Sequence, residues 1–242
     1  LEEIKTITNI DPKTASDAGA IVPLLGNENS PEALVDIAAA INSKKKIQAL
    51  KITEIPNQTY LDAVLEDSSA SMSLKRRLTG LSKSKGVTVD FESVVTHELS
   101  NTINELSSQS SCEWLVMGWD GRSHSGILVS NPIGWLLANI NSNLALFKDK
   151  GVRHVGKVLL ALRPGRKDRN FIETAQRVCT FYGASLTLLH VVPEKTTSKT
   201  IFAMEEKSSS KLEQSMVKAE VSIVKSDDPV GTISGMSAGY DL

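Results

Sequence analysis

Cysteine is scarce in this sequence. Cys112 and Cys179 are the two that occur in 242 residues, and both lie inside apolar stretches. Two thiols make no disulfide framework, so the composition fits a reducing compartment, and we expect a cytoplasmic protein. Neither cysteine has a base close to it in sequence, which favours core packing over a nucleophilic role.

An excess of charge of one sign is lacking, and so are long apolar runs. The formal net charge is −1, so no global field favours nucleic acid or an anionic membrane surface. The most apolar segment, 126–140, is interrupted by Ser130, Asn131 and Pro132 and is shorter than the ~20 residues of a bilayer span. No signal peptide is visible. We expect no nucleic-acid partner and no direct membrane insertion by this chain.

Catalytic and metal-binding motifs are missing as well. None of the four histidines has a second ligand at metal spacing, and neither Cys-x-x-Cys nor Gly-x-Ser-x-Gly occurs. His190 alternates with apolar residues in a candidate strand, which predicts a buried, hydrogen-bonded imidazole. The sequence therefore predicts no catalytic residue, no metal site, no cofactor and no enzymatic activity.

An internal repeat organises the chain. The apolar run 21–25 (IVPLL) matches 158–162 (VLLAL), and the two runs start 137 residues apart (158 minus 21). The same offset places Leu34 on Phe171, Ile41 on Val178 and Pro56 on Pro193. An ungapped match through strand, helix and strand indicates two copies of one unit.

Each copy begins with a strand–helix–strand pattern. Ser30 followed by Pro31 predicts a helix N-terminus, and the apolar residues after it recur at the helical period. In the first copy we expect strands at 21–25, 47–55, 87–94, 114–117 and 144–147 and helices at about 60–82, 99–108 and 132–140. In the second copy we expect strands at 158–162, 184–192 and 221–224, a helix at 232–237, and 240–242 aligned with the opening of the fourth strand.

The predicted fold class is α/β, with two tandem doubly wound parallel-sheet units in Rossmann-type layers. The boundaries are an N-terminal lead-in at 1–18, a first unit at 19–152 and a second unit at 153–242. The second unit stops at the fourth strand, so we expect it to be truncated at its C-terminus. The polar, serine-rich segment 193–216 predicts a flexible connection.

Two segments resemble the universal stress protein family in its tandem form. They are the strand–proline opening 21–24 (IVPL) and the segment 116–121 (VMGWDG), in a matching order of elements. In the nucleotide-binding members an Asp ends the first strand, and a Gly-x2-Gly-x9-Gly-Ser/Thr loop follows the fourth. The resemblance makes Gly118 and Gly121 nucleotide-binding candidates. The third glycine is replaced by Asn131, and Leu25 and Leu162 stand at the Asp positions, so the apparatus is degraded.

The stretch 114–121 (WLVMGWDG), the degraded loop and the tandem arrangement also resemble the C-terminal cytoplasmic domain of secondary transporters in the amino acid–polyamine–cation superfamily, prokaryotic cation-chloride cotransporters in particular. This resemblance implies a non-catalytic regulatory and assembly domain and a homodimer. It also implies a membrane-spanning domain in the same polypeptide ahead of Leu1. The alternative is a stand-alone tandem universal stress protein that binds ATP or another adenine nucleotide.

Three further groups of residues are candidates for binding. Arg166 and Arg169 precede or open a predicted helix, where they either hold an anion or form a solvated basic loop. Trp119 and Trp135 either form an interface or pack beneath the glycine loop. The cluster 75–77 (KRR) is basic, but no aromatic residues alternate with it as nucleic-acid binding would require.

Overall fold

The computed structural model of the chain describes residues 6–8, 18–26, 28–44, 46–59, 69–109, 112–119, 132–163, 168–213 and 217–242. The chain divides into two compact units, residues 1–150 and residues 151–242. The candidates Gly121 and Arg166, and part of the helix predicted at 60–82, lie outside the described residues.

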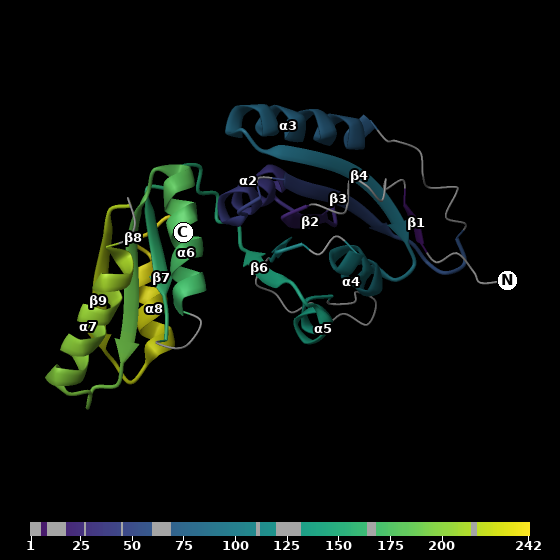
Figure 1. Cartoon of the computed structure of the whole chain (residues 1–242). Helices are drawn as coiled ribbons and strands as arrows, with labels where there is room; N and C mark the ends of the chain where they lie inside the picture. Colours follow the sequence, from purple (N-terminus) through teal and green to yellow (C-terminus); the bar gives the residue numbers. More distant parts are fainter. Residues whose placement is uncertain are drawn as a thin grey trace. The chain divides into compact units, whose positions relative to one another are not determined.

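A parallel sheet forms the centre of the first unit (Figure 1). Its strands are β2 (Ala20–Leu24), β3 (Lys46–Glu54), β4 (Thr88–Thr96), β5 (Trp114–Gly118) and β6 (Asn143–Phe147). They lie in the order β4-β3-β2-β5-β6, and all neighbours are parallel. The predicted α/β fold with a doubly wound parallel sheet is confirmed.

Helices cover both faces of this sheet. The helices α2 (Pro31–Ile41) and α3 (Ser69–Lys85) pack together on one face. On the other face, α4 (Leu99–Gln109) and α5 (Pro132–Asn139) bury Ile103 and Leu136 against Leu50 and Leu115 of the sheet. Figure 1 shows α3 above the sheet and α4 and α5 below it. The first-copy helices that were predicted are therefore present wherever the structure describes them.

The first helix begins where its sequence predicts. The Ser30 hydroxyl accepts a hydrogen bond from the Ala33 N–H at 3.3 Å, and Pro31 occupies the first helical position, where no N–H is needed. The residues of α2 that face the sheet are at most 8% exposed. Because α2 follows β2 after a short loop, its first residues lie near the carboxyl end of β2.

The second unit repeats this order. Its elements are β7 (Lys157–Ala161), α6 (Asp168–Tyr182), β8 (Ser185–Val192), α7 (Ser198–Leu212), β9 (Ala219–Lys225) and α8 (Pro229–Ser237). The strands are parallel in the order β7-β8-β9. Asp241 and Leu242 bond to Lys157 and Leu159 on β7, as Glu113 and Trp114 bond to Gly19 beside β2. The predicted alignment of 240–242 with the fourth strand agrees with these bonds.

A carboxylate holds this C-terminal segment beside β7. Asp241 Oδ2 accepts hydrogen bonds from the N–H groups of Gly156 and Lys157, both at 2.9 Å. These two bonds, the Gly156 bond first, hold the pKa of the Asp241 carboxyl below its usual range.

The structure adds to or differs from the predicted elements at three places. A short strand, β1 (Thr6–Thr8), lies in the region predicted as a lead-in and pairs antiparallel with β4. The segment predicted as a flexible connection contains α7, because Ser208 and Leu212 turn inward and are at most 7% exposed. The helix expected at 232–237 begins at Pro229, after an Asp228 cap that accepts the Gly231 N–H at 3.0 Å.

The predictions about buried residues are confirmed. His190 is 2% exposed, with Nδ1 2.9 Å from the Leu162 carbonyl and Nε2 2.9 Å from the Ser208 hydroxyl. Cys112 and Cys179 are 5% and 1% exposed, and burial raises the pKa of the Cys179 thiol to about 11. A thiol with such a pKa stays protonated at neutral pH, which fits packing. Over the residues described, no helix has the length and apolarity that a membrane crossing requires.

Candidate functional site

The strand order of the first sheet reverses between β2 and β5. The chain leaves β2 through α2 on one face, whereas the helix after β5, α5, lies on the other. Ligands of open α/β sheets bind at such a switch point, beyond the carboxyl ends of the strands. The residues at this position are Leu25 and Gly26 after β2, and Gly118 and Trp119 at the end of β5.

A carboxylate of the chain itself occupies this position. Glu28 Oε1 accepts the Leu25 N–H at 2.5 Å, and Glu28 Oε2 accepts the Gly26 N–H at 2.9 Å. Gly26 has a φ of +85°, a conformation that glycine adopts without steric cost. Two successive amides directed at one anion form the kind of concave cradle that binds phosphate in other proteins. In this chain Glu28 supplies the anion.

Gly118 faces the same carboxylate. A Cβ atom at this position would lie 3.5 Å from Glu28 Cγ and 3.5 Å from Leu34 Cδ1, both ordinary van der Waals distances. The predicted nucleotide-binding glycine is exposed, and it lies beside Glu28 and Leu34. Its predicted companion, Gly121, lies outside the described residues, so the Gly-x2-Gly loop itself stays a prediction.

The two leucines at the predicted Asp positions, Leu25 and Leu162, have structural roles. Leu25 is partly buried and packs against the core cluster beneath the sheet's α4 face. The Leu162 N–H donates to the Leu189 carbonyl at 3.0 Å, and its own carbonyl is 2.9 Å from His190 Nδ1. Neither side chain offers an acceptor for a ribose or a base.

The two tryptophans predicted as interface residues are exposed. Trp119 is 44% exposed and Trp135 38%. The Trp119 N–H donates to the Phe147 carbonyl at 2.8 Å, which continues the β5–β6 pairing, and Lys148 Nζ lies 5.9 Å from the Trp119 ring centroid. In the part of the chain that the structure describes, no ring contact joins the two indoles. Their role at an interface stays a prediction.

The basic pair predicted to hold an anion is described only in part. Arg169 lies in the first turn of α6, and its Nε forms an ion pair with Glu173 Oε1 at 2.7 Å. Both side chains are exposed, so water and salt weaken this pair. A bound anion would compete with Glu173 for the guanidinium. Anion binding at Arg166 and Arg169 stays a prediction.

No grouping of three metal-ligating side chains occurs within the described ranges. At the carboxyl ends of β3 and β4, the polar groups bond to the backbone instead. Glu54 Oε1 accepts the Leu99 N–H at 3.2 Å, and His97 Nδ1 is 3.1 Å from the Ile55 carbonyl. These contacts fix the start of α4.

Comparison with solved structures gives a consistent fold. Neither a protein-family model nor a curated protein matches the sequence. A solved universal stress protein from Archaeoglobus fulgidus DSM 4304 superposes with a TM-score of 0.61 at 16% identity, over 92% of this chain and 84% of that one. The cytoplasmic domain of a prokaryotic cation chloride cotransporter superposes with a TM-score of 0.58 at 14% identity, over 87% of this chain and 80% of that one. The chain has the universal stress protein-like α/β fold.

Sequence reasoning located this site but missed its central residue. Gly118 and Leu25 were identified from the resemblance to the nucleotide-binding universal stress proteins. Glu28 has no motif around it, because its bonds depend on the left-handed turn at Gly26 and not on a spacing of residue types. The sequence signal for this role is weak: Glu28 is a carboxylate two residues before the Ser30 N-cap.

Proposed function

We propose that this chain is a non-catalytic regulatory and assembly domain on the cytoplasmic side of a membrane secondary transporter of the cation-chloride cotransporter kind. In this proposal the membrane-spanning domain belongs to the same polypeptide. The fold shared with the cotransporter's cytoplasmic domain supports it. The alternative, a stand-alone tandem universal stress protein that binds an adenine nucleotide, draws on the likeness to the Archaeoglobus fulgidus protein.

The position of Glu28 favours the first function. Its carboxylate already accepts the two amides at the switch point, and a phosphate placed there would meet a negative charge. Leu25 supplies an apolar side chain where a nucleotide-binding member of the family has an acceptor. In the described residues at the switch point, the backbone amides that could bind a phosphate are already bonded to Glu28.

Nucleotide titration tests the proposal. Purified chain titrated with a fluorescent ATP analogue is expected to show no saturable binding in the micromolar range. The Glu28→Gln variant keeps the size of the side chain and loses its charge, so it is expected to bind the analogue measurably tighter than the unmodified chain. Micromolar affinity in the unmodified chain would instead support the adenine-nucleotide alternative.

Assembly is the second part of the proposal, and the β6 edge is the surface that supports it. The strand β6 lies at one edge of the sheet and β1 at the other, so among the described strands the outer backbone groups of β6 have no strand partner. Leu146 on this strand is 38% exposed, near Trp119 at the end of the paired strand β5. An apolar, aromatic edge of this kind suits a homodimer in which two copies meet at β6.

Sedimentation equilibrium of charge-substituted chains tests the homodimer. Leu146→Asp places a charge in the β6 edge and is expected to weaken the dimer by at least about tenfold, as loss of a central interface residue does. Phe202→Asp is the matched control, since Phe202 is an exposed apolar residue of α7, 68% exposed. Equal effects of the two substitutions, or a monomeric unmodified chain, would contradict assembly through β6.

A further inference from the structure

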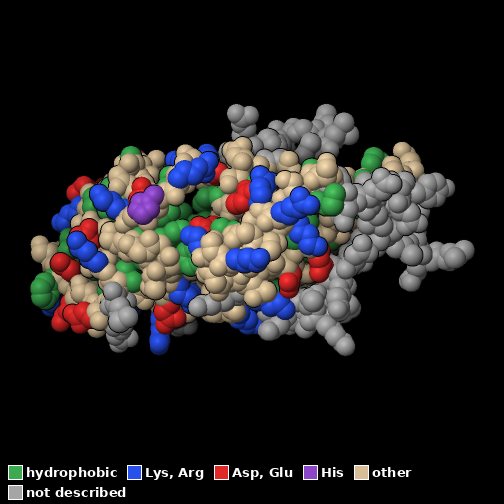
Figure 2. Space-filling model, turned by 90° about the horizontal axis from the view of Figure 1, so that it is seen from above, with side chains coloured by type: hydrophobic (Ala, Val, Ile, Leu, Met, Phe, Trp, Pro, Cys, Tyr) green, Lys and Arg blue, Asp and Glu red, His purple; other side chains and the backbone are tan. Residues whose placement is uncertain are grey.

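Helix α3 carries charge of one sign. Its seventeen residues include five basic side chains, Lys75, Arg76, Arg77, Lys83 and Lys85, and no acidic one. All five are exposed, while Ser71, Leu74 and Leu78 face inward. Figure 2, which looks down on this helix, shows Lys and Arg side chains gathered over it. The chain as a whole has a net charge of −1, so this face is a local feature.

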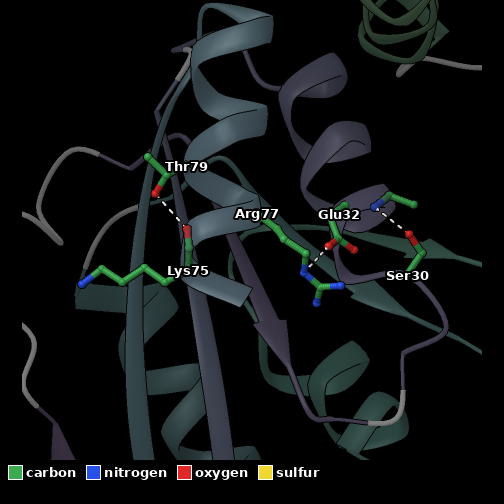
Figure 3. A network of polar contacts seen from close by, with 6 residues as sticks. Ser30, Glu32, Lys75, Arg77 and Thr79 are labelled. Carbon is green, nitrogen blue, oxygen red and sulfur yellow. Dashed lines mark hydrogen bonds and ion pairs between the residues drawn. The ribbon is translucent and has the colours of Figure 1, made fainter. Parts of the chain in front are cut away.

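The five cations differ in their partners. Arg77 Nε pairs with Glu32 at 2.9 Å (Figure 3). Lys85 Nζ pairs with Asp36 at 3.4 Å, so both cations join α3 to α2. Within the residues that the structure describes, no carboxylate lies within ion-pair distance of Lys75, Arg76 or Lys83. Two cations therefore hold the helix in place, and three are available to a partner.

Two of the three available cations lie on one outward-facing stripe of α3, and Lys75 lies next to it. Met72, Arg76, Thr79 and Lys83 follow one another at intervals of three or four residues, which places them on one side of the helix. Gly80 lies beside them, with nothing within 4 Å of where its Cβ would be. Met72 is 47% exposed. From Met72 to Lys83 the stripe is about 17 Å long, and it carries two cations and one apolar side chain at its start.

We propose that this face of α3 is a docking surface for an anionic phospholipid bilayer. Basic residues on an amphipathic helix are attracted to anionic headgroups, and a long unbranched side chain such as that of Met72 can enter the headgroup layer. The inference rests on the proposed function in one respect. A domain tethered to a membrane-spanning part is held at high local concentration near the lipid, so a few cations suffice.

The chemistry of the stripe favours lipid over other polyanions. It has no aromatic side chain on which a nucleic-acid base could stack. Met72 is its one apolar side chain, because Arg76, Thr79 and Lys83 follow it along the stripe, whereas an acidic amphipathic peptide needs a row of apolar contacts. A planar array of phosphates matches a straight row of separated cations.

Vesicle binding by the full chain tests the proposal. The probes are vesicles of phosphatidylcholine with 30 mol% phosphatidylserine, and vesicles of phosphatidylcholine alone, at low ionic strength. The chain is expected to bind the first and not the second, and binding is expected to fall as salt is added. The triple variant Lys75→Gln, Arg76→Gln, Lys83→Gln is expected to bind the anionic vesicles more weakly by on the order of 100-fold.

A second triple variant separates this face from net charge. Lys195→Gln, Lys199→Gln, Lys207→Gln removes three exposed cations from the second unit and changes the net charge equally. It is expected to bind as the unmodified chain does. The proposal is overturned if the unmodified chain ignores anionic vesicles, if both triple variants weaken binding alike, or if an acidic peptide or DNA binds this face and vesicles do not. None of these results bears on the nucleotide titration, so the proposed function is tested separately.

Discussion

Replacing His190 by alanine is expected to lower the free energy of unfolding of the second unit by about 3 kcal/mol. The imidazole is 2% exposed and joins the Leu162 carbonyl, at the end of β7, to the Ser208 hydroxyl of α7. Its removal leaves a cavity, and Ser208, itself 7% exposed, loses a partner that water reaches poorly. Urea unfolding, with amide exchange at β8 to identify the unit, measures the effect.

Two other substitutions calibrate this result. Ser208→Ala removes one of the two hydrogen bonds and is expected to cost about 1 kcal/mol. His154→Ala removes an exposed imidazole of the same unit and is expected to change stability by less than about 0.5 kcal/mol. A His190→Ala effect as small as that of His154→Ala would show that His190 does not join β7 to α7.

The sequence predicted the burial of His190 but not its partners. Alternation with apolar residues in β8 was sufficient to place the imidazole inside. Ser208 belongs to a serine-rich segment whose composition predicts a flexible connection, and only tertiary packing selects which of its serines turns inward. The composition of a segment describes all its residues together, so it cannot predict that one serine, Ser208, is buried. The 137-residue repeat was the better guide, because it matches this segment to the first-copy segment that contains α3.

Element boundaries were predictable where a local rule applies at the position. Ser30 and Pro31 were recognised, and α2 begins there. Asp228 and Pro229 form the same N-cap and first-position proline pair at the start of α8. This pair was overlooked, and the helix was predicted to begin at 232. The strand β1 has three residues and depends on its pairing with β4, so no local sequence pattern predicts it.

The candidate site shows the same division. The resemblance to nucleotide-binding universal stress proteins identified Gly118, Leu25 and Leu162, because these positions follow from the sequence pattern of those proteins. The carboxylate that fills the switch point was not identified, since its two bonds need the positive φ of Gly26 and the exit direction of α2 together. The role of Glu28 can therefore be recognised only from the three-dimensional structure.

Gly19→Ala is expected to destabilise the first unit by about 3 kcal/mol. A Cβ at this position would overlap the Asn42 side chain, with Cγ at 2.7 Å and Oδ1 closer still. Asn42 is 4% exposed and cannot turn away freely, because its Nδ2 donates to the Lys46 carbonyl at 2.9 Å and its Oδ1 accepts the Lys44 N–H at 2.8 Å. Urea unfolding of the full chain measures the loss.

The double variant Gly19→Ala, Asn42→Ala separates steric overlap from other causes. Asn42→Ala removes all three atoms that the new Cβ would meet, so the two effects are expected to be non-additive by at least about 1.5 kcal/mol. Gly80→Ala is the matched control: it lies in α3 with open space around it, and it is expected to stabilise the chain by up to about 1 kcal/mol. Additive effects at Gly19 and Asn42 would contradict the overlap. The Gly19 carbonyl accepts the N–H groups of Glu113 and Trp114, so displacement of Gly19 would also loosen β2 against β5. Glu28 lies beside the far ends of these two strands.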